Sequence, residues 1–125
     1  MLVTLPRITR SFNEATGLVE TQEDVIKAQV DTSFRAHLKW EENFQAFKGL
    51  TLTEMTAVVA DIIKDRSKAV SKITDILRVL YCYLQSDELP TFNDFLGLLD
   101  LENTQVIIQK ITTVLEGVGN TAAKN

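Results

Sequence analysis

The feature that most constrains the fold is an apolar series between Val70 and Leu84, where apolar residues recur every three or four positions. This spacing is the period of one face of a helix. The face is widened by four further residues, Ile76, Val79, Tyr81 and Tyr83. It is then broader than the stripe that a single neighbouring element would cover. The sequence therefore predicts a central helix over 70–84 with other elements packed on several sides of it.

Start and stop signals predict a second helix before this central one. Thr51 and Glu54 form a capping-box pattern in front of an apolar series over 52–62. The polar stretch 64–68 then separates that series from the central helix. Pro90 ends the central helix, because proline cannot continue the backbone hydrogen-bond ladder.

The C-terminal part carries two more helix patterns. Thr91 is expected to cap a short helix with the apolar residues Phe92, Phe95, Leu96 and Leu99. Asn103 or Thr104 opens the last helix. Gly117 and Gly119 are expected to end it, because glycine commonly follows a helix C-terminus.

One segment fits two periods. From Ile26 to Trp40 alternate residues are apolar or Thr, as in a half-buried strand. Such a strand would be far longer than the usual ~5–6 residues. Residues 31–33 are Asp-Thr-Ser, the types that cap a helix start. We therefore expect a strand to about Val30, a cap at 31–33 and a helix to about Phe47.

The N-terminal residues predict a β ribbon. Residues 2–12 alternate and are rich in β-branched types, but Pro6 cannot donate to a strand ladder and restricts this strand to a sheet edge. Asn13 and Gly17 indicate a connection over 13–22 between two strands.

Together these patterns predict a mainly α chain of the α+β class. A short β ribbon (1–32) is followed by about five packed helices (33–119). With 125 residues the chain is long enough for one core. We expect one domain over 1–120 and a flexible tail over 120–125.

Composition argues against several classes of protein. The 13 basic residues are scattered among 17 acidic ones, and the net charge of −4 disfavours a nucleic-acid surface. No apolar stretch approaches the ~20 residues that span a bilayer, so we expect no membrane partner. The first ten residues lack the basic-then-apolar order of a secretion signal, which favours an intracellular protein. Cys82 lies in an apolar helical pattern and is expected to be a buried, inert thiol.

The sequence contains no catalytic constellation. His37 is the only histidine, and a partly exposed structural role is expected for it. No spacing suits a metal site, and no glycine-rich loop suits a cofactor phosphate. Asp61 with Asp65, and Glu41 with Glu42, are best interpreted as solvated helix faces. We therefore expect a protein that is not an enzyme and that has no cofactor.

Aromatic residues remain as the candidate functional feature. They form the core in one interpretation, and in the other some of them line a groove for a partner helix. On the helix expected after the cap, Phe34, Leu38 and Glu41 share one face, and Trp40, Phe44 and Phe47 mark another. The candidate partner-binding residues are Phe34, Trp40, Phe44, Tyr81, Tyr83, Phe92 and Phe95.

Two stretches, VDTSFRAHLKWEENF (30–44) and LRVLYCYLQSDELPTFNDFLGLLDL (77–101), resemble the tail assembly chaperones of long-tailed (siphovirus) phages that infect Gram-positive bacteria. In the first, an extended D-T-S segment runs into a helix with W-E near its middle. In the second, an L-Y-C-aromatic-L helix is followed by an acidic turn and a T-F-x-x-F-L helix. The matching residues are Thr32, Trp40, Glu41, Tyr81, Cys82, Phe92, Phe95 and Leu96.

The resemblance, which covers about a third of the chain, implies a specific role. Members of this family coat the tape-measure protein in the host cytoplasm, keep it soluble, help to bring major tail (tube) proteins to it, and are absent from the finished virion. Many copies along one filament would gain from side-by-side assembly, so we expect self-association into oligomers through a head-to-tail contact and not a two-fold one. A frameshifted longer product is common in the family, and Ala123-Lys124-Asn125 can be encoded with the slippery heptamer A AAA AAC.

An alternative hypothesis is a small helical adaptor or regulatory module without a tail role. Gene order separates the two hypotheses. A major tail protein gene upstream and a very long helical gene downstream would favour the chaperone.

Overall fold

The computed structural model of the protein describes residues 2–44 and 49–123. In this part of the chain a small antiparallel sheet is followed by helices, so the α+β class with an N-terminal ribbon is confirmed. A 3-10 turn, η2 (Leu101–Asn103), precedes the last helix. The α-helices are α1 (Phe34–Phe44), α2 (Leu52–Ile62), α3 (Arg66–Ser71), α4 (Ile73–Tyr83), α5 (Phe92–Leu98) and α6 (Thr104–Ala123).

The sheet has the strand order β1-β2-β3, and β1 (Leu2–Asn13) pairs along its full length with residues 18–29 of β2 (Leu18–Val30). The two-residue β3 (Leu84–Gln85) pairs with the end of β2. β1 lies at the edge, as the proline within it predicts.

The connection between the two long strands is shorter than predicted. A connection between two strands does lie within 13–22, as predicted, but only residues 14–17 turn and Leu18 already belongs to β2. The Asn13 side chain accepts hydrogen bonds from the backbone N–H groups of Ala15 (2.9 Å) and Thr16 (3.3 Å). Gly17 takes a positive φ of 70°, a conformation that glycine adopts without a steric penalty. These local bonds close the turn in four residues.

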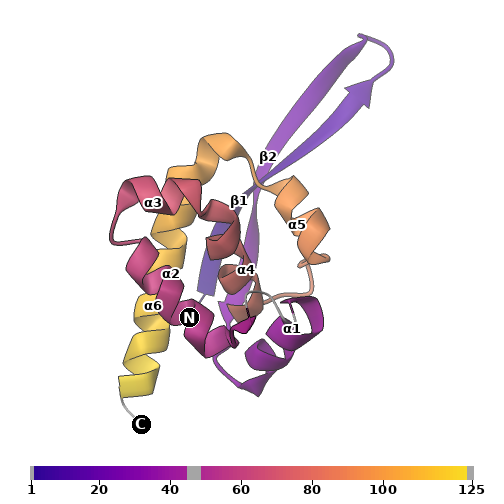
Figure 1. Ribbon diagram of the computed structural model, residues 1–125. Coiled ribbons are helices and arrows are strands. Elements are labelled where there is room, and N and C mark those ends of the chain that lie inside the picture. Colours follow the sequence, from indigo (N-terminus) through magenta and orange to yellow (C-terminus); the bar gives the residue numbers. More distant parts are fainter. Residues whose placement is uncertain (1, 45–48, 124–125) are drawn as a thin grey trace.

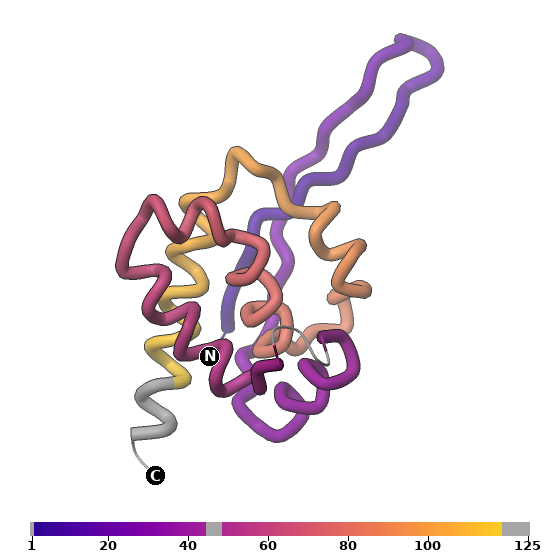
Figure 2. Tube along the Cα trace, viewed as in Figure 1, coloured from indigo at the N-terminus to yellow at the C-terminus, as the bar shows by residue number. Residues whose placement is uncertain are grey.

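The β ribbon divides into two halves. The half formed by the start of β1 and the end of β2 packs on the helices. Its buried residues include Val3, Leu5, Ile26 and Ala28. Residues 9–25, which we call the arm, are almost entirely exposed and project beyond the helices (Figures 1 and 2).

The change from strand to helix occurs where the cap residues predict it. The Asp31 side chain accepts a hydrogen bond from the Ser33 N–H at 2.8 Å. Ser33 in turn accepts from the Arg35 N–H through its hydroxyl (3.3 Å) and from the Ala36 N–H through its carbonyl (3.0 Å). α1 therefore begins at Phe34. The predicted helix end near Phe47 lies outside the described residues.

The capping box before α2 is also confirmed. The Thr51 hydroxyl accepts from the Glu54 N–H at 3.2 Å, and the Glu54 carboxylate accepts from the Thr51 N–H at 3.1 Å. Both bonds satisfy backbone donors that the helix itself leaves unpaired.

The predicted central helix over 70–84 is wrong at both ends. Asp65 caps α3 by accepting from two backbone N–H groups, so a separate helix begins inside the predicted polar interruption. The chain then breaks at Lys72, where the backbone leaves the helical region. At the other end Leu84 is extended and pairs with Val30 in the sheet. The central helix is therefore α4, from Ile73 to Tyr83.

α4 nevertheless occupies the centre of the fold. It lies between α2, α3 and α6 on one side and α1 and α5 on the other (Figure 1). Almost all of its last eight residues are buried, which explains its wide apolar face. Its buried residues include Ile76, Val79, Leu80 and Cys82.

The predicted end of the last helix at Gly117 and Gly119 is wrong as well. α6 continues through both glycines to Ala123, so 120–123 is helical, and the remainder of the predicted flexible tail lies outside the described residues. A terminating glycine adopts a positive φ, and Gly117 does not. Here the glycines lower helix propensity without ending the helix.

Candidate partner-binding surface

The structure separates the seven candidate aromatic residues by burial. Phe34 is 91% exposed, and Phe92 is half-buried. The burial of the other five supports their interpretation as core: Trp40, Phe44, Tyr81, Tyr83 and Phe95.

Five of these rings form one cluster that joins α1, α4 and α5. Ring centroids lie 5.2 Å apart for Trp40 and Phe44, and 4.8 Å apart for Phe44 and Phe92. Tyr81 lies 5.3 Å from both Phe92 and Phe95. Tilted and edge-on pairs at these distances add stability beyond the burial of apolar area. Three of the residues that carry the family resemblance in the second half of the chain, Tyr81, Phe92 and Phe95, belong to this cluster.

The polar atoms of the buried rings have partners. The Trp40 Nε1–H donates to the Leu50 carbonyl at 3.0 Å, and the Tyr81 hydroxyl donates to the Pro90 carbonyl at 2.6 Å. The Tyr83 hydroxyl lies 2.9 Å from the Thr56 hydroxyl. Because a buried unpaired donor is costly, these bonds fix the rings in place.

Lys39 and Cys82 lie next to this cluster. The Lys39 Nζ donates to the Leu84 carbonyl at 3.0 Å and lies 4.1 Å from the centre of the Tyr81 ring. Burial lowers the pKa of Lys39 and raises the pKa of the Cys82 thiol to about 12. Cys82 is therefore buried, as predicted, and protonated at neutral pH.

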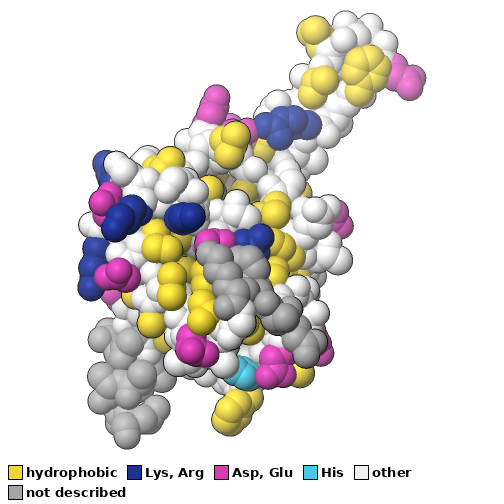
Figure 3. Space-filling model, in the orientation of Figure 1, with side chains coloured by type: hydrophobic (Ala, Val, Ile, Leu, Met, Phe, Trp, Pro, Cys, Tyr) yellow, Lys and Arg dark blue, Asp and Glu magenta, His cyan; other side chains and the backbone are white. Residues whose placement is uncertain are grey.

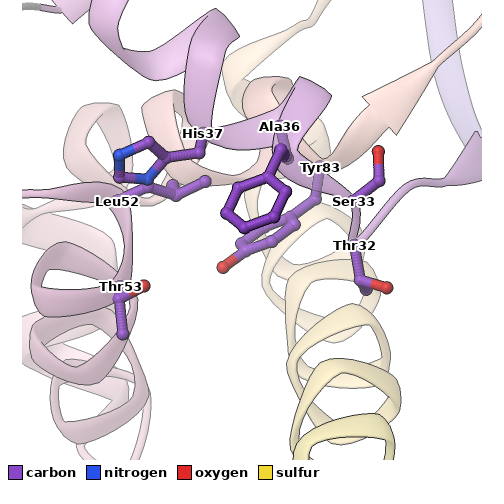
Figure 4. Close-up of a pocket in the computed structure, with 8 residues that line it drawn as sticks. Thr32, Ser33, Ala36, His37, Leu52, Thr53 and Tyr83 are labelled. Carbon is purple, nitrogen blue, oxygen red and sulfur yellow. The ribbon is translucent and has the colours of Figure 1, made fainter.

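A pocket of about 370 Å³ opens beside the first turn of α1. It lies between the start of α1, the start of α2 and the end of α4, and Figure 4 shows Tyr83 and Leu52 at its base. Its lining combines apolar side chains with short polar ones. The lining residues are Thr32, Ser33, Phe34, Ala36, His37, Leu52, Thr53 and Tyr83.

The cap residues 31–33 explain why Phe34 stands at the rim of this pocket. They fix the first helical position at Phe34, and the opposite face of α1 carries the buried residues Ala36, Trp40 and Phe44. Leu38, one turn after Phe34, is also exposed. Residues at i and i+4 are neighbours on a helix surface, so the two form an apolar stripe in solvent. We call this stripe, together with the pocket, the Phe34 surface.

His37 borders the same pocket and is partly exposed. Its Nε2 lies 3.2 Å from the Glu41 carboxylate one turn later on α1. This is an ordinary surface pair between residues four apart on a helix. Within residues 2–44 and 49–123, no three side chains of the types that bind metal ions converge. No helix in this described part of the chain is long and apolar enough to cross a membrane.

One exposed apolar group was not predicted from the sequence. It lies at the end of the arm and consists of Phe12, Leu18 and Val19, all largely exposed (Figure 3). Apolar residues directly beside the turn-forming Asn13 and Gly17 were the signal that could have indicated it.

Comparison with known proteins gives no relative. No family model, no curated protein and no solved structure matches the chain.

Proposed function

We propose that this protein is a phage tail assembly chaperone without enzymatic activity. It binds amphipathic helices of the tape-measure protein, keeps that protein soluble in the host cytoplasm, and helps to recruit tube subunits before it leaves the assembly. The observation that carries the proposal is the 91% exposure of Phe34 at the rim of an apolar-floored pocket. The resemblance of residues 30–44 and 77–101 to this chaperone family supports it.

The Phe34 surface suits a helical partner. Phe34 and Leu38 are exposed one turn apart, and the pocket floor is formed by Leu52 and Tyr83. An amphipathic helix binds such a surface by placing residues spaced three or four apart into the groove. Burial of one large apolar side chain contributes about 1.5–3 kcal/mol, so a short contact repeated along a filament would suffice.

The two side chains most suited to catalysis, His37 and Cys82, support binding instead of catalysis. His37 pairs with a carboxylate on its own helix, and Cys82 is buried and protonated. A nucleophile needs an activating base and access to substrate. The described residues place neither of these groups in such an arrangement.

Co-expression with the tape-measure protein encoded by the same genome tests the proposal. We expect the wild-type protein to keep the tape-measure protein in the soluble fraction. Phe34→Ala should lose most of this effect, since it removes the exposed anchor of the surface. Leu101→Ala is the matched control, because Leu101 is 86% exposed on η2, away from α1 (Figure 1).

Two outcomes would contradict this proposal. Tape-measure protein that precipitates equally with and without this protein would exclude the chaperone role and favour the adaptor hypothesis. Equal solubilisation by Phe34→Ala and wild type would exclude the Phe34 surface. Circular dichroism of both variants verifies that the fold is unchanged.

A further inference from the structure

The arm is an unpartnered structure whose end is apolar. Phe12 pairs directly with Val19 across the ribbon, so both side chains lie on one face. Leu18 pairs with Asn13 and lies on the other face. Phe12 is 63% exposed, and the other two are similarly exposed. An isolated two-stranded hairpin is only marginally stable in water, so an apolar end on both faces indicates a contact with another surface.

The end of the arm is also acidic. Residues 11–23 contain Glu14, Glu20 and Glu23 and no lysine or arginine, which gives this segment a charge of −3. All three glutamates are exposed. A surface that binds the end of the arm should therefore be basic and partly apolar.

The opposite composition occurs on α3. Residues 64–72 contain four cations and one carboxylate, Asp65, which gives a charge of +3. The cations are exposed, and Val70 among them is 44% exposed. Figure 3 shows Lys and Arg side chains gathered at the edge of the body where α3 lies, with hydrophobic side chains beside them. We call this surface the basic ridge, formed by Lys64, Arg66, Val70, Lys68 and Lys72.

The ridge cations have little to neutralise them within the described chain. Lys64 lies 3.9 Å from Asp61, and both side chains are exposed. Asp65 is engaged in capping α3. In the described part of the chain, Lys68 and Lys72 form no ion pair.

The arm cannot reach the ridge of its own molecule. The arm leaves the body on the side away from α3, and the two are separated by the helices in Figures 1 and 2. We propose that the arm of one copy, through Phe12, Leu18, Val19 and its glutamates, docks on the basic ridge of a second copy. Because the arm and the basic ridge lie on different sides of the molecule, each copy can contact one neighbour through its arm and another through its ridge.

Complementary charge reversal tests this contact with the purified protein. The arm variant is Glu14→Lys with Glu23→Lys, and the ridge variant is Lys68→Glu with Lys72→Glu. Glu20 is left in place because its carboxylate accepts a hydrogen bond from Asn13. Like charges then meet in each variant, so sedimentation velocity should show each self-associating at least about tenfold more weakly than wild type.

Mixing the two variants should restore assembly. The reversed arm then meets the reversed ridge, and the unchanged arm meets the unchanged ridge. The matched control is Glu102→Lys with Glu116→Lys, which changes the net charge as the arm variant does but lies on η2 and α6. The control should assemble as wild type does. Added salt should weaken wild-type assembly, because exposed charges are screened beyond ~8 Å at physiological ionic strength.

Each contrary result overturns the proposal. Wild-type protein that stays monomeric at all concentrations, variants that assemble as wild type does, or a mixture that remains monomeric would each exclude the arm–ridge contact. Phe12→Ser should weaken assembly without any charge change, and Leu101→Ser should not. The measurement uses no tape-measure protein, so failure here is distinguishable from failure of the proposed chaperone function.

Discussion

The helical body and the arm contain similar apolar residues but place them in opposite environments. In the body, Trp40, Tyr81 and Phe95 pack in one aromatic cluster, and their polar atoms are paired. In the arm, Phe12 and Val19 have the same chemistry but face solvent. The same β ribbon belongs to the core at one end and to the surface at the other.

The interactions that hold the arm are of a different kind. Beyond the backbone ladder, Arg7 at the base of the arm pairs across the ribbon with Asp24, and the bonded atoms lie 2.6 and 2.7 Å apart. Arg10 pairs with Asp100 on the body. Exposed ion pairs contribute little to stability. The comparison indicates that the body supplies the free energy of unfolding and that the arm is available for contacts.

Trp40→Ala, in the body, should cause the largest loss in the free energy of unfolding. The ring is only 2% exposed, and truncation of a buried aromatic side chain costs about 3–5 kcal/mol. The change also leaves the Leu50 carbonyl without its indole donor. The free energy of unfolding of native proteins is only about 5–15 kcal/mol, so the variant should be marginally stable in a urea titration.

Phe34→Ala is the control for this measurement, because it removes an aromatic ring from the same helix. We expect the free energy of unfolding to change by no more than about 0.5 kcal/mol, as for other surface substitutions. Equal stability of Trp40→Ala and wild type would contradict the burial of this ring and return Trp40 to the partner-contact interpretation.

These positions also show what the sequence could predict. Helix starts at Phe34 and Leu52 depend on side chains within three residues of the helix, so the cap residues predicted them. The pairing of Leu84 with Val30 depends on segments far apart in the chain. Periodicity therefore extended the central helix through residues that tertiary contacts assign elsewhere.

The candidate surface was predicted only in part. Periodicity correctly separated the Phe34 face of α1 from the face that carries Trp40 and Phe44. It could not say which of these faces meets α4 and α5, because that depends on packing between helices. The exposure of Phe34 and the pocket beside it became visible only in the structure.

Raising the pH should cause the second largest loss of stability, and this loss should come from the body alone. The folded pKa of Cys82 is about 12, whereas an unburied thiol ionises near 9.0. Above pH 9 the unfolded state loses this proton, whereas the folded state keeps it. The contribution of the thiol to the free energy of unfolding is therefore fully present below pH 9 and is lost as the pH rises towards 12. The slope should be about 1.4 kcal/mol per pH unit for one such group.

Burial also raises the pKa of Tyr81 and Tyr83, and both shifts act in the same direction as that of the thiol. The lowered pKa of Lys39 acts in the opposite direction and is common to wild type and Cys82→Ala. Urea titrations across this pH range measure the slope. Cys82→Ala should retain the tyrosine contribution and lose the thiol contribution, so its slope should be shallower. An identical slope in Cys82→Ala and wild type would contradict the raised thiol pKa.

Shortening the arm should change the free energy of unfolding only slightly, although it removes the most atoms. Residues 11–20 can be replaced by Asn-Gly, so that Arg10 and Thr21, which are cross-strand partners, flank a two-residue turn. The removed residues are almost all exposed, so the free energy of unfolding should change by less than about 1 kcal/mol.

Leu5→Ala, in the packed half of the same ribbon, should cost about 2–5 kcal/mol because it leaves a cavity. Both are measured by urea titration at low protein concentration, where assembly adds nothing to stability. A larger loss from the shortened arm than from Leu5→Ala would mean that the arm belongs to the cooperative core, and the division between a stabilising body and a contacting arm would be wrong.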